Sequence, residues 1–219
     1  MDGGVLRNNY MNIVVWGLGK HAINRILPAV KTSQEFNLYG VCSRSKGVVN
    51  QVMTSHNIKG WTSSEEMLLD NEIEAIYLST PPALHKKQVI EVLESGKHVL
   101  CEKPLTMSLE ETSFLIKESI SKNLCLMEGI MYLHHPHYKA LEKLIASKEL
   151  GTINKVSCSF QLPPLERPGY RKQSQLGASA LYDLGLYPVS MVLNLFSGAN
   201  IEIQSKDIKI FQKQDFDVS

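Results

Sequence analysis

A glycine-rich turn, WGLGKHA at residues 16–22, has the residue spacing of a dinucleotide-binding site. It matches the pattern G-x-G-x-x-A, in which Gly17 allows a tight turn, Gly19 lets the backbone approach a pyrophosphate, and Ala22 lets a helix pack closely on a sheet. The N–H groups that begin such a helix favour phosphate binding. Glycines also mark ordinary turns, so the prediction depends on a strand before the turn and a helix after it. The predicted cofactor contacts here are Gly17, Leu18, Gly19, Lys20, His21 and Ala22.

The end of the second apolar stretch, VCSRSKG at residues 41–47, indicates which dinucleotide is preferred. An NAD site usually has an acidic residue here, which binds the ribose 2′-hydroxyl. This chain has Ser43 and Arg44 instead, and a hydroxyl with a guanidinium would hold a 2′-phosphate by charge-assisted hydrogen bonds. The sequence therefore predicts NADP in preference to NAD. The alternative is that Arg44 is a solvated loop residue.

Two more apolar stretches end in residues that could line the same site. In STPPALH, residues 79–85, two prolines stiffen a turn and begin a helix, and such a turn at the end of a central strand would flank the cofactor. The candidate contacts there are Thr80, Pro81 and His85. In VLCEKPLT, residues 99–106, a carboxylate, an ammonium and a proline follow directly on Cys101. Taken alone, that segment fits equally well a buried strand that surfaces into a polar loop.

The segment DLGLY holds two further groups capable of chemistry. Asp183 and Tyr187 are four residues apart, so they share one helix face and can point into one cleft. The alternative is an amphipathic core helix with an incidental Asp and Tyr. Three histidines crowd around one proline but have no acidic or cysteine residue at ligand spacing, so no metal site is predicted. They are His134, His135 and His137.

The elements that must position these residues alternate between strand and helix through residue 128. The predicted strands are 12–17, 36–43, 75–80, 97–102 and 124–128. The predicted helices are 21–30, 63–70, 83–96 and 108–122, with capping boxes at Ser63 and Ser108 and a glycine stop at Gly96. The strands are apolar throughout, which is typical of a parallel sheet covered on both faces. The predicted class is α/β, with a doubly wound Rossmann sheet.

The pattern changes after residue 128. A helix is predicted for 136–151, an alternating strand for 152–162, a loop for 163–177, an apolar helix for 178–198 and another alternating strand for 201–212. Two strands do not make a stable open sheet, so this α+β domain is expected to be incomplete. The predicted division is a polar leader at 1–10, a Rossmann domain at 11–128 and a partial second domain at 129–219.

Composition limits the class of protein. Lys and Arg number 23 against 22 Asp and Glu, so no basic field is expected to hold nucleic acid or a membrane. We found no apolar run approaching the roughly 20 residues of a membrane helix, and no signal peptide pattern. The four cysteines lie in or beside apolar runs without a metal or disulfide spacing, which predicts buried thiols in a cytoplasmic protein. They are Cys42, Cys101, Cys125 and Cys158.

Three segments in one order, GLGKHA, STPPALH and GKHVLCEKPLT, resemble the glucose–fructose oxidoreductase / inositol dehydrogenase family, written Gfo/Idh/MocA. The later LMEGIMYLHHP and ALYDLGLYP resemble its branch with xylose dehydrogenase and dihydrodiol dehydrogenase. The resemblance extends from about residue 11 to about residue 211. It implies an NADP-dependent oxidoreductase that transfers a hydride between nicotinamide and a carbinol or carbonyl of a sugar or polyol.

The resemblance also implies roles for individual residues. Glu102 and Lys103 would lie beside the nicotinamide, with the ammonium of Lys103 at the reacting oxygen, where it stabilises developing negative charge. The phenol of Tyr187 would give and take the proton, and Asp183 would bind or orient substrate hydroxyls. The other expected substrate contacts are Tyr132 and Arg171.

The match to the family breaks at the end of the chain. The family's second domain continues with several more strands, on which members often pair, so homo-oligomers through this domain are expected. The sequence ends at QDFDVS, which is expected of a fragment or a truncated product. Two alternative functions follow: a dinucleotide-binding sensor or interaction partner without catalysis, and a dehydrogenase of a nucleotide-linked sugar.

Overall fold

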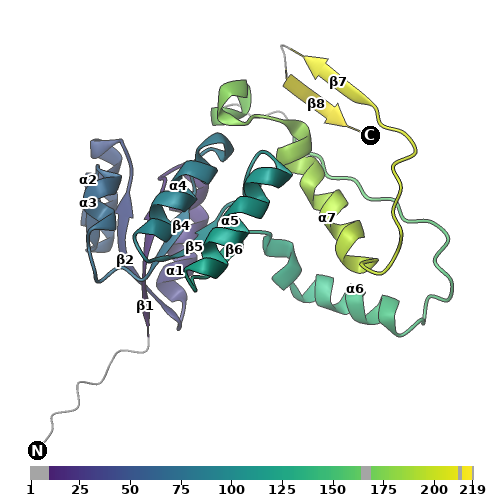
Figure 1. The fold of residues 1–219 in the computed structure, drawn as a ribbon, viewed down its shortest axis with the longest axis horizontal. Helices are drawn as coiled ribbons and strands as arrows, with labels where there is room; N and C mark the ends of the chain where they lie inside the picture. The colour runs from purple at the N-terminus through teal and green to yellow at the C-terminus, as the bar shows by residue number, and fades with distance from the viewer. Residues whose placement is uncertain (1–9, 164–168, 212–213, 219) are drawn as a thin grey trace, which may run out of the picture. The chain divides into compact units, whose positions relative to one another are not determined.

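The computed structural model describes residues 10–163, 169–211 and 214–218 (Figure 1). The chain divides into two compact units between Glu128 and Gly129. Each unit is described by itself.

The first unit contains a six-stranded parallel sheet, which confirms the predicted α/β class. The strand order is β3-β2-β1-β4-β5-β6. The strands are β1 (Met11–Trp16), β2 (Phe36–Cys42), β3 (Lys59–Trp61), β4 (Ala75–Leu78), β5 (His98–Cys101) and β6 (Leu126–Glu128). The order reverses beside β1, and at such a switch point the carboxyl ends of neighbouring strands open a crevice for a ligand.

Five strands were predicted, and β3 was missed together with the helix before it, α2 (Lys46–His56). Strand β3 has three residues, one of them Gly60, so it shows neither an apolar run nor an alternation. Its structure comes from pairing with β2 along Gly40–Cys42. A segment this short is a strand only because a neighbour supplies its hydrogen bonds.

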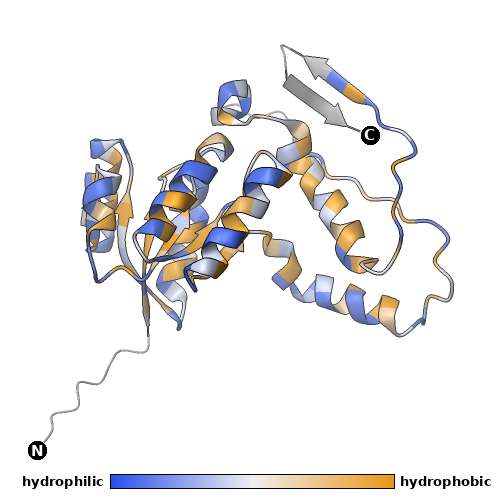
Figure 2. Cartoon of the chain, viewed as in Figure 1, coloured by the Kyte–Doolittle hydropathy of each residue, from blue (hydrophilic) through white to orange (hydrophobic). Residues whose placement is uncertain are grey.

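Helices cover both faces of the sheet, as the apolar strands require (Figure 2). Val14 of β1 packs in one core cluster, whereas its neighbours Ile13 and Val15 pack in another on the opposite face. The remaining helices of this unit are α1 (Leu27–Thr32), α3 (Ser64–Leu68), α4 (Pro82–Glu94) and α5 (Leu109–Ser121). Ser63 and Ser108 cap the two helices predicted to begin there, since Ser63 accepts the N–H of Glu66 and Ser108 that of Glu111, the serine half of each capping box.

Two π-helical turns each come just before a proline. The segment Ala22–Ile26 precedes Pro28 of α1, and Leu181–Gly185 precedes Pro188 of α7 (Leu186–Leu195). A proline has no N–H to donate and crowds the preceding turn, and a π-turn is one way to accommodate it. The single helices predicted for 21–30 and 178–198 are therefore each a π-turn followed by an α-helix.

Most of the regular structure that is described in the second unit is helical. Its helices are a 3₁₀ turn (Met131–His134), α6 (Pro136–Ala146), two more 3₁₀ turns (Gly169–Lys172 and Ser174–Leu176), the π-turn and α7. Strands β7 (Ile208–Phe211) and β8 (Gln214–Val218) form an antiparallel pair. The strand predicted for 152–162 is wrong, since those residues form no regular element, and the strand predicted for 201–212 is confined to β7. Alternation alone cannot make a strand that has no partner to bond with.

Three other predictions need correction or detail. Cys125 is exposed and Cys158 half-buried, so only Cys42 and Cys101 are the buried thiols predicted; burial raises the pKa of Cys42 to about 12.

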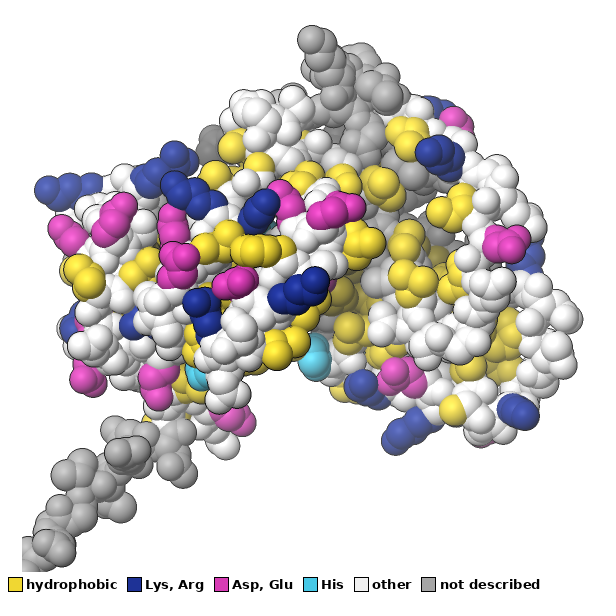
Figure 3. Space-filling model, viewed as in Figure 1, with side chains coloured by type: hydrophobic (Ala, Val, Ile, Leu, Met, Phe, Trp, Pro, Cys, Tyr) yellow, Lys and Arg dark blue, Asp and Glu magenta, His cyan; other side chains and the backbone are white. Residues whose placement is uncertain are grey.

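Within the described residues, one segment, Ser174–Leu195, is long and apolar enough to cross a membrane by length and composition, contrary to our expectation that none is. This is weak evidence. On the face shown in Figure 3, cationic and anionic side chains of the first unit are interspersed.

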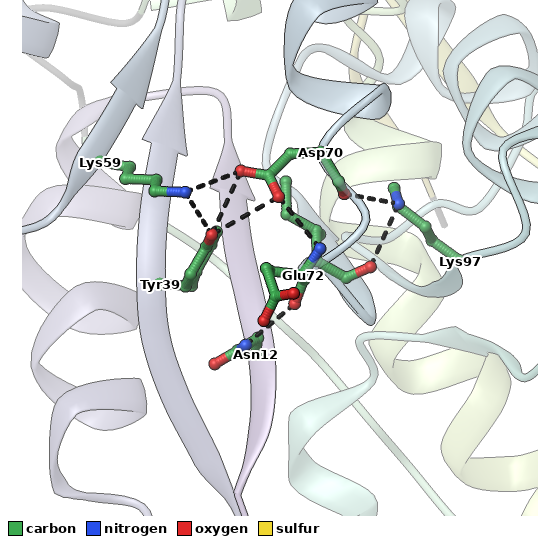
Figure 4. A network of polar contacts seen from close by, with 7 residues as sticks. Asn12, Tyr39, Lys59, Asp70, Glu72 and Lys97 are labelled. Carbon is green, nitrogen blue, oxygen red and sulfur yellow. Dashed lines mark hydrogen bonds and ion pairs between the residues drawn. The ribbon is translucent and has the colours of Figure 1, made fainter.

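A polar network ties the amino ends of the strands together (Figure 4). Lys97, only 4% exposed, donates to the carbonyl oxygens of Asp70 at 3.0 Å and Ile73 at 3.1 Å. Burial lowers the pKa of Lys97, with the charge of Asp70 opposing the shift. Lys59 and Tyr39 bond to each other and both contact the carboxylate of Asp70. The loop before β4 is thus held by side chains from two other parts of the sheet.

We expect Lys97→Met to lower the free energy of unfolding by about 1–3 kcal/mol, because two carbonyl oxygens lose their donor while the apolar stem is kept. Urea denaturation of the variant measures the change. Lys117→Met, at an exposed position on α5, is the control and should stay within about 0.5 kcal/mol of the wild type. Equal stability of the two variants would contradict the assigned role of Lys97.

Candidate active site

The carboxyl ends of the parallel strands bring most of the predicted residues of the first unit to one edge. Gly17 follows β1, Ser43 follows β2, Thr80 follows β4 and Glu102 follows β5. Glu128, which was not among the predicted site residues, ends β6. All five positions lie at the same edge because the strands run parallel.

The glycine turn has room for a ligand at one glycine and none at the other. Gly17 has φ +106°, and a Cβ there would lie 2.5 Å from the backbone oxygen of Ser79. At Gly19 a Cβ would meet no protein atom within 4 Å. The N–H of Ile23 bonds to the oxygen of Gly19 at 3.0 Å, which begins the helix directly after the turn. The open side of Gly19 at a helix start fits a bound pyrophosphate.

Glu102 connects the glycine turn to the sheet. One of its carboxylate oxygens accepts the Tyr77 hydroxyl at 2.5 Å and lies 3.1 Å from Nε2 of His21, and the other accepts the Lys103 N–H at 3.3 Å. Burial acts to raise the pKa of Glu102, but the bonds from His21 and Tyr77 and the charge of Lys103 outweigh it and hold the pKa below its usual value. Glu102 is therefore an anion that orients its neighbours.

The backbone around Lys103 is held by two side chains from other elements. His85 of α4 has Nδ1 2.8 Å from the oxygen of Pro104, and Glu128 accepts the Leu105 N–H at 2.7 Å. The Lys103–Pro104 peptide bond is cis. Burial raises the pKa of Glu128, against the N–H of Leu105 and the charge of Lys103. The charge of Lys103 thus acts on two carboxyl groups, those of Glu102 and Glu128, and acts to lower the pKa of each.

The prediction that His85 contacts the cofactor conflicts with its position. Its side chain is 0% exposed, and its second ring nitrogen lies 2.9 Å from the oxygen of Thr80. Both nitrogens are therefore occupied by protein carbonyls, which leaves the ring a role within the protein. Thr80 itself donates its hydroxyl to Gln88 and packs next to Gly17. Pro81 precedes α4 and Pro82 begins it, as predicted.

The side chains that would select NADP lie after β2. The Ser43 N–H bonds to the oxygen of Trp61 at 3.1 Å, which fixes the backbone there. Arg44 is exposed, and so are Lys20 and His21 of the glycine turn, whereas Leu18 is partly buried and Ala22 is fully buried. A guanidinium therefore lies just after the second strand, at the position where an NAD site usually has a carboxylate.

In the second unit, Arg171 and Asp183 bind each other. Nε of Arg171 bonds to one carboxylate oxygen of Asp183, and Nη2 lies 3.2 Å from the other, in a bidentate pair. The bond to Asp183 raises the pKa of Arg171. Both residues were predicted to contact the substrate, and their pairing with each other was not predicted. Asp183 is only 6% exposed, and the guanidinium of Arg171 neutralises the charge of its buried carboxylate.

Tyr187 lies in an aromatic cluster and is 8% exposed. Its ring stacks on Phe160 at 4.6 Å and meets Tyr132 edge to face at 6.2 Å, and its hydroxyl lies 3.6 Å from the sulfur of Met131. Tyr132 in turn bonds to Ser190 at 2.9 Å. Phe160 was missed because it lies in the segment predicted as a strand.

The histidine cluster has a structural contact. Nδ1 of His135 accepts the His137 N–H at 3.2 Å, which caps α6. Within the described residues, no group of three or more His, Cys, Asp or Glu side chains is placed to hold a metal ion.

Two family profiles match the chain. The first, described as "Oxidoreductase family, NAD-binding Rossmann fold", matches residues 11–130. The second, described as "GFO/IDH/MocA C-terminal domain", matches residues 138–215.

Individual proteins match over much of this chain. A dTDP-3,4-didehydro-2,6-dideoxy-alpha-D-glucose 3-reductase of Saccharopolyspora spinosa is 31% identical over 86% of this chain and 57% of its own length. A trans-1,2-dihydrobenzene-1,2-diol dehydrogenase of Xenopus laevis is 32% identical over 80% of this chain and 52% of its own. The crystal structure of KijD10, a 3-ketoreductase from Actinomadura kijaniata in complex with NADP and TDP-benzene, superimposes with a TM-score of 0.81 at 28% identity, over 85% of this chain and 57% of that one. The chain thus spans little more than half the length of these relatives.

Proposed function

This chain belongs to the Gfo/Idh/MocA oxidoreductase family, and we propose that it forms the cofactor-binding and catalytic part of an NADP-dependent oxidoreductase. The substrate would be a carbinol or carbonyl of a sugar or polyol. The observation that carries the proposal is the carboxyl edge of the sheet, where the His21–Glu102 contact links the loop that holds the open side of Gly19 to the Glu102–Lys103 segment. The similarity to KijD10, whose structure contains NADP, supports this cofactor.

Different residues of the first unit would bind different parts of NADP. The pyrophosphate would lie against Gly19 and the start of the following helix. Ser43 and Arg44 would hold the 2′-phosphate, because a guanidinium and a hydroxyl form charge-assisted hydrogen bonds to it. Thr80 and Pro81 would flank the bound cofactor, on the loop that packs next to Gly17.

The chemistry would be shared between cofactor and protein. When bound, NADP supplies or accepts the hydride. The Lys103 ammonium hydrogen-bonds the reacting oxygen and stabilises the negative charge that develops there, while Glu102 orients the segment. The Tyr187 phenol of the second unit is the proposed proton donor in reduction and proton acceptor in oxidation. The Arg171–Asp183 pair holds the start of the Tyr187 helix and presents polar groups to substrate hydroxyls.

Arg44→Glu should weaken NADPH binding by tenfold or more, about 1.5–3 kcal/mol, because a charge-assisted bond is lost and the new carboxylate repels the 2′-phosphate. NADH affinity should not fall, because an acidic residue here can bind the ribose 2′-hydroxyl, so the ratio of the NADPH to the NADH dissociation constant rises at least tenfold. Quenching of Trp16 fluorescence, directly before the glycine turn, follows both titrations. Lys117→Glu, with the same charge change on α5, is the control. An unchanged ratio in Arg44→Glu would mean that the 2′-phosphate is held elsewhere.

A nucleotide-linked sugar is the second candidate for the substrate. It is favoured by the similarity to the Saccharopolyspora spinosa reductase, whose name gives a dTDP-linked deoxysugar ketone. Turnover of NADPH with a dTDP-linked ketosugar but not with free aldoses, inositols or dihydrodiols would select it. NADPH binding without turnover of any of these classes would instead favour a dinucleotide sensor without catalysis.

A further inference from the structure

The buried imidazole of His85 joins two loops at the carboxyl edge of the sheet. Nδ1 lies 2.8 Å from the oxygen of Pro104, the residue after Lys103. Nε2 lies 2.9 Å from the oxygen of Thr80, whose methyl group would lie 3.0 Å from a Cβ at Gly17. One ring therefore contacts both the lysine segment and the turn next to the glycine turn.

Both partners are carbonyl oxygens, which only accept hydrogen bonds. A neutral imidazole carries one N–H, so it can make one of these bonds, whereas the protonated ring makes both. Burial lowers the pKa of His85, against the two carbonyls and the charge of Glu102. The protonated ring makes the complete bridge, whereas the neutral ring, which the lowered pKa favours, donates to one carbonyl and leaves its other nitrogen facing the second.

We propose that His85 is a positioning residue, which fixes Lys103 through Pro104 and fixes the cofactor-facing turn through Thr80. It touches neither substrate nor cofactor, since its side chain is 0% exposed. The assignment rests on the proposed function, because it matters only if Lys103 and the turn do the work assigned to them. It replaces the direct cofactor contact that the sequence suggested for His85.

The two bonds can be tested one at a time with amide side chains. The amide nitrogen of asparagine overlies Nδ1 of histidine, so His85→Asn keeps the bond to Pro104 and loses the one to Thr80. The amide nitrogen of glutamine overlies Nε2, so His85→Gln does the reverse. His98→Asn, at the opposite end of the sheet, is the control, because it removes a different single bond between a histidine ring and the backbone, the one in which Nδ1 of His98 accepts the N–H of Cys125.

Three measurements separate the outcomes: NADPH affinity, turnover, and the acetylation rate of Lys103 by acetic anhydride relative to the exposed Lys117. In His85→Gln we expect turnover to fall about tenfold and the Lys103 rate to change about threefold or more, with NADPH affinity within about twofold of wild type. In His85→Asn we expect NADPH affinity to fall about threefold to tenfold, with more turnover retained than in His85→Gln and the Lys103 rate unchanged.

Proportional losses of affinity and turnover in both variants would overturn the proposal, because a ring that only fills space predicts no such division. Variants that match His98→Asn in all three measurements would overturn it as well. If the wild type neither binds NADPH nor turns over any substrate, the proposed function fails. The acetylation rate of Lys103 needs neither cofactor nor substrate, so it still decides whether His85 positions Lys103.

Discussion

Replacing Lys103 with alanine is expected to lower kcat by about a hundredfold to a thousandfold, because the reacting oxygen loses the cation that stabilises its developing charge. NADPH affinity should stay within about threefold, since the substitution keeps the backbone bonds that fix this segment. Those bonds run from Lys103 N–H to Glu102 and from Leu105 N–H to Glu128. Steady-state kinetics together with fluorescence titration separates the two effects.

Two variants make the Lys103 result specific. Lys103→Arg keeps the positive charge on a longer, planar group, so it should retain more turnover than Lys103→Ala without reaching the wild type. Lys117→Ala removes a charge from the exposed face of α5 and should leave kcat unchanged. Wild-type turnover in Lys103→Ala would show that the reacting oxygen lies elsewhere.

Gly19→Ala is expected to weaken NADPH binding by tenfold or more while leaving the unfolding free energy within about 0.5 kcal/mol of the wild type. The reason is that a Cβ at Gly19 meets no protein atom within 4 Å, so the methyl group would fill only space that we assign to the pyrophosphate. Fluorescence titration and urea denaturation of one preparation give both values.

Two other glycines serve as matched controls. Gly17→Ala should destabilise the fold itself by about 1–3 kcal/mol, because Gly17 has φ +106° and its Cβ would lie 2.5 Å from the oxygen of Ser79. Gly47→Ala, within α2 and with no neighbour within 4 Å, should stabilise the helix by about 0.5–1 kcal/mol and leave binding unchanged. Unaltered NADPH affinity in Gly19→Ala would place the pyrophosphate away from this turn.

Much of the first unit could be predicted because its signals are local. Apolar runs gave the buried strands, Ser63 and Ser108 gave two helix starts, and Gly96, with φ +76°, gave a helix end. The order of the motifs also indicated the family. Strand β3 escaped, since three residues with a central glycine carry no pattern of their own.

The second unit was predicted less well because its signals depend on partners. The alternation in 152–162 indicates a strand, but a strand needs a neighbour to take its hydrogen bonds, and the structure gives this segment none in a regular element. Strand β7 forms because β8 pairs with it. Phe160 then serves as an aromatic partner of Tyr187 rather than as a strand residue.

The sequence alone determined which chemical groups this protein has and the α/β class that carries them, because strand burial, helix caps and glycine spacing act over a few residues. Only the tertiary structure decided how those groups are engaged. The buried ring of His85 contacts the carbonyl oxygens of Pro104 and Thr80. Glu128 accepts the N–H of Leu105, and Arg171 pairs with Asp183. Each of these contacts joins residues 5 to 23 positions apart in the chain. Their partners are chosen by how the loops and helices pack, since a hydrogen bond depends on distance and direction in space, and residue type reports neither.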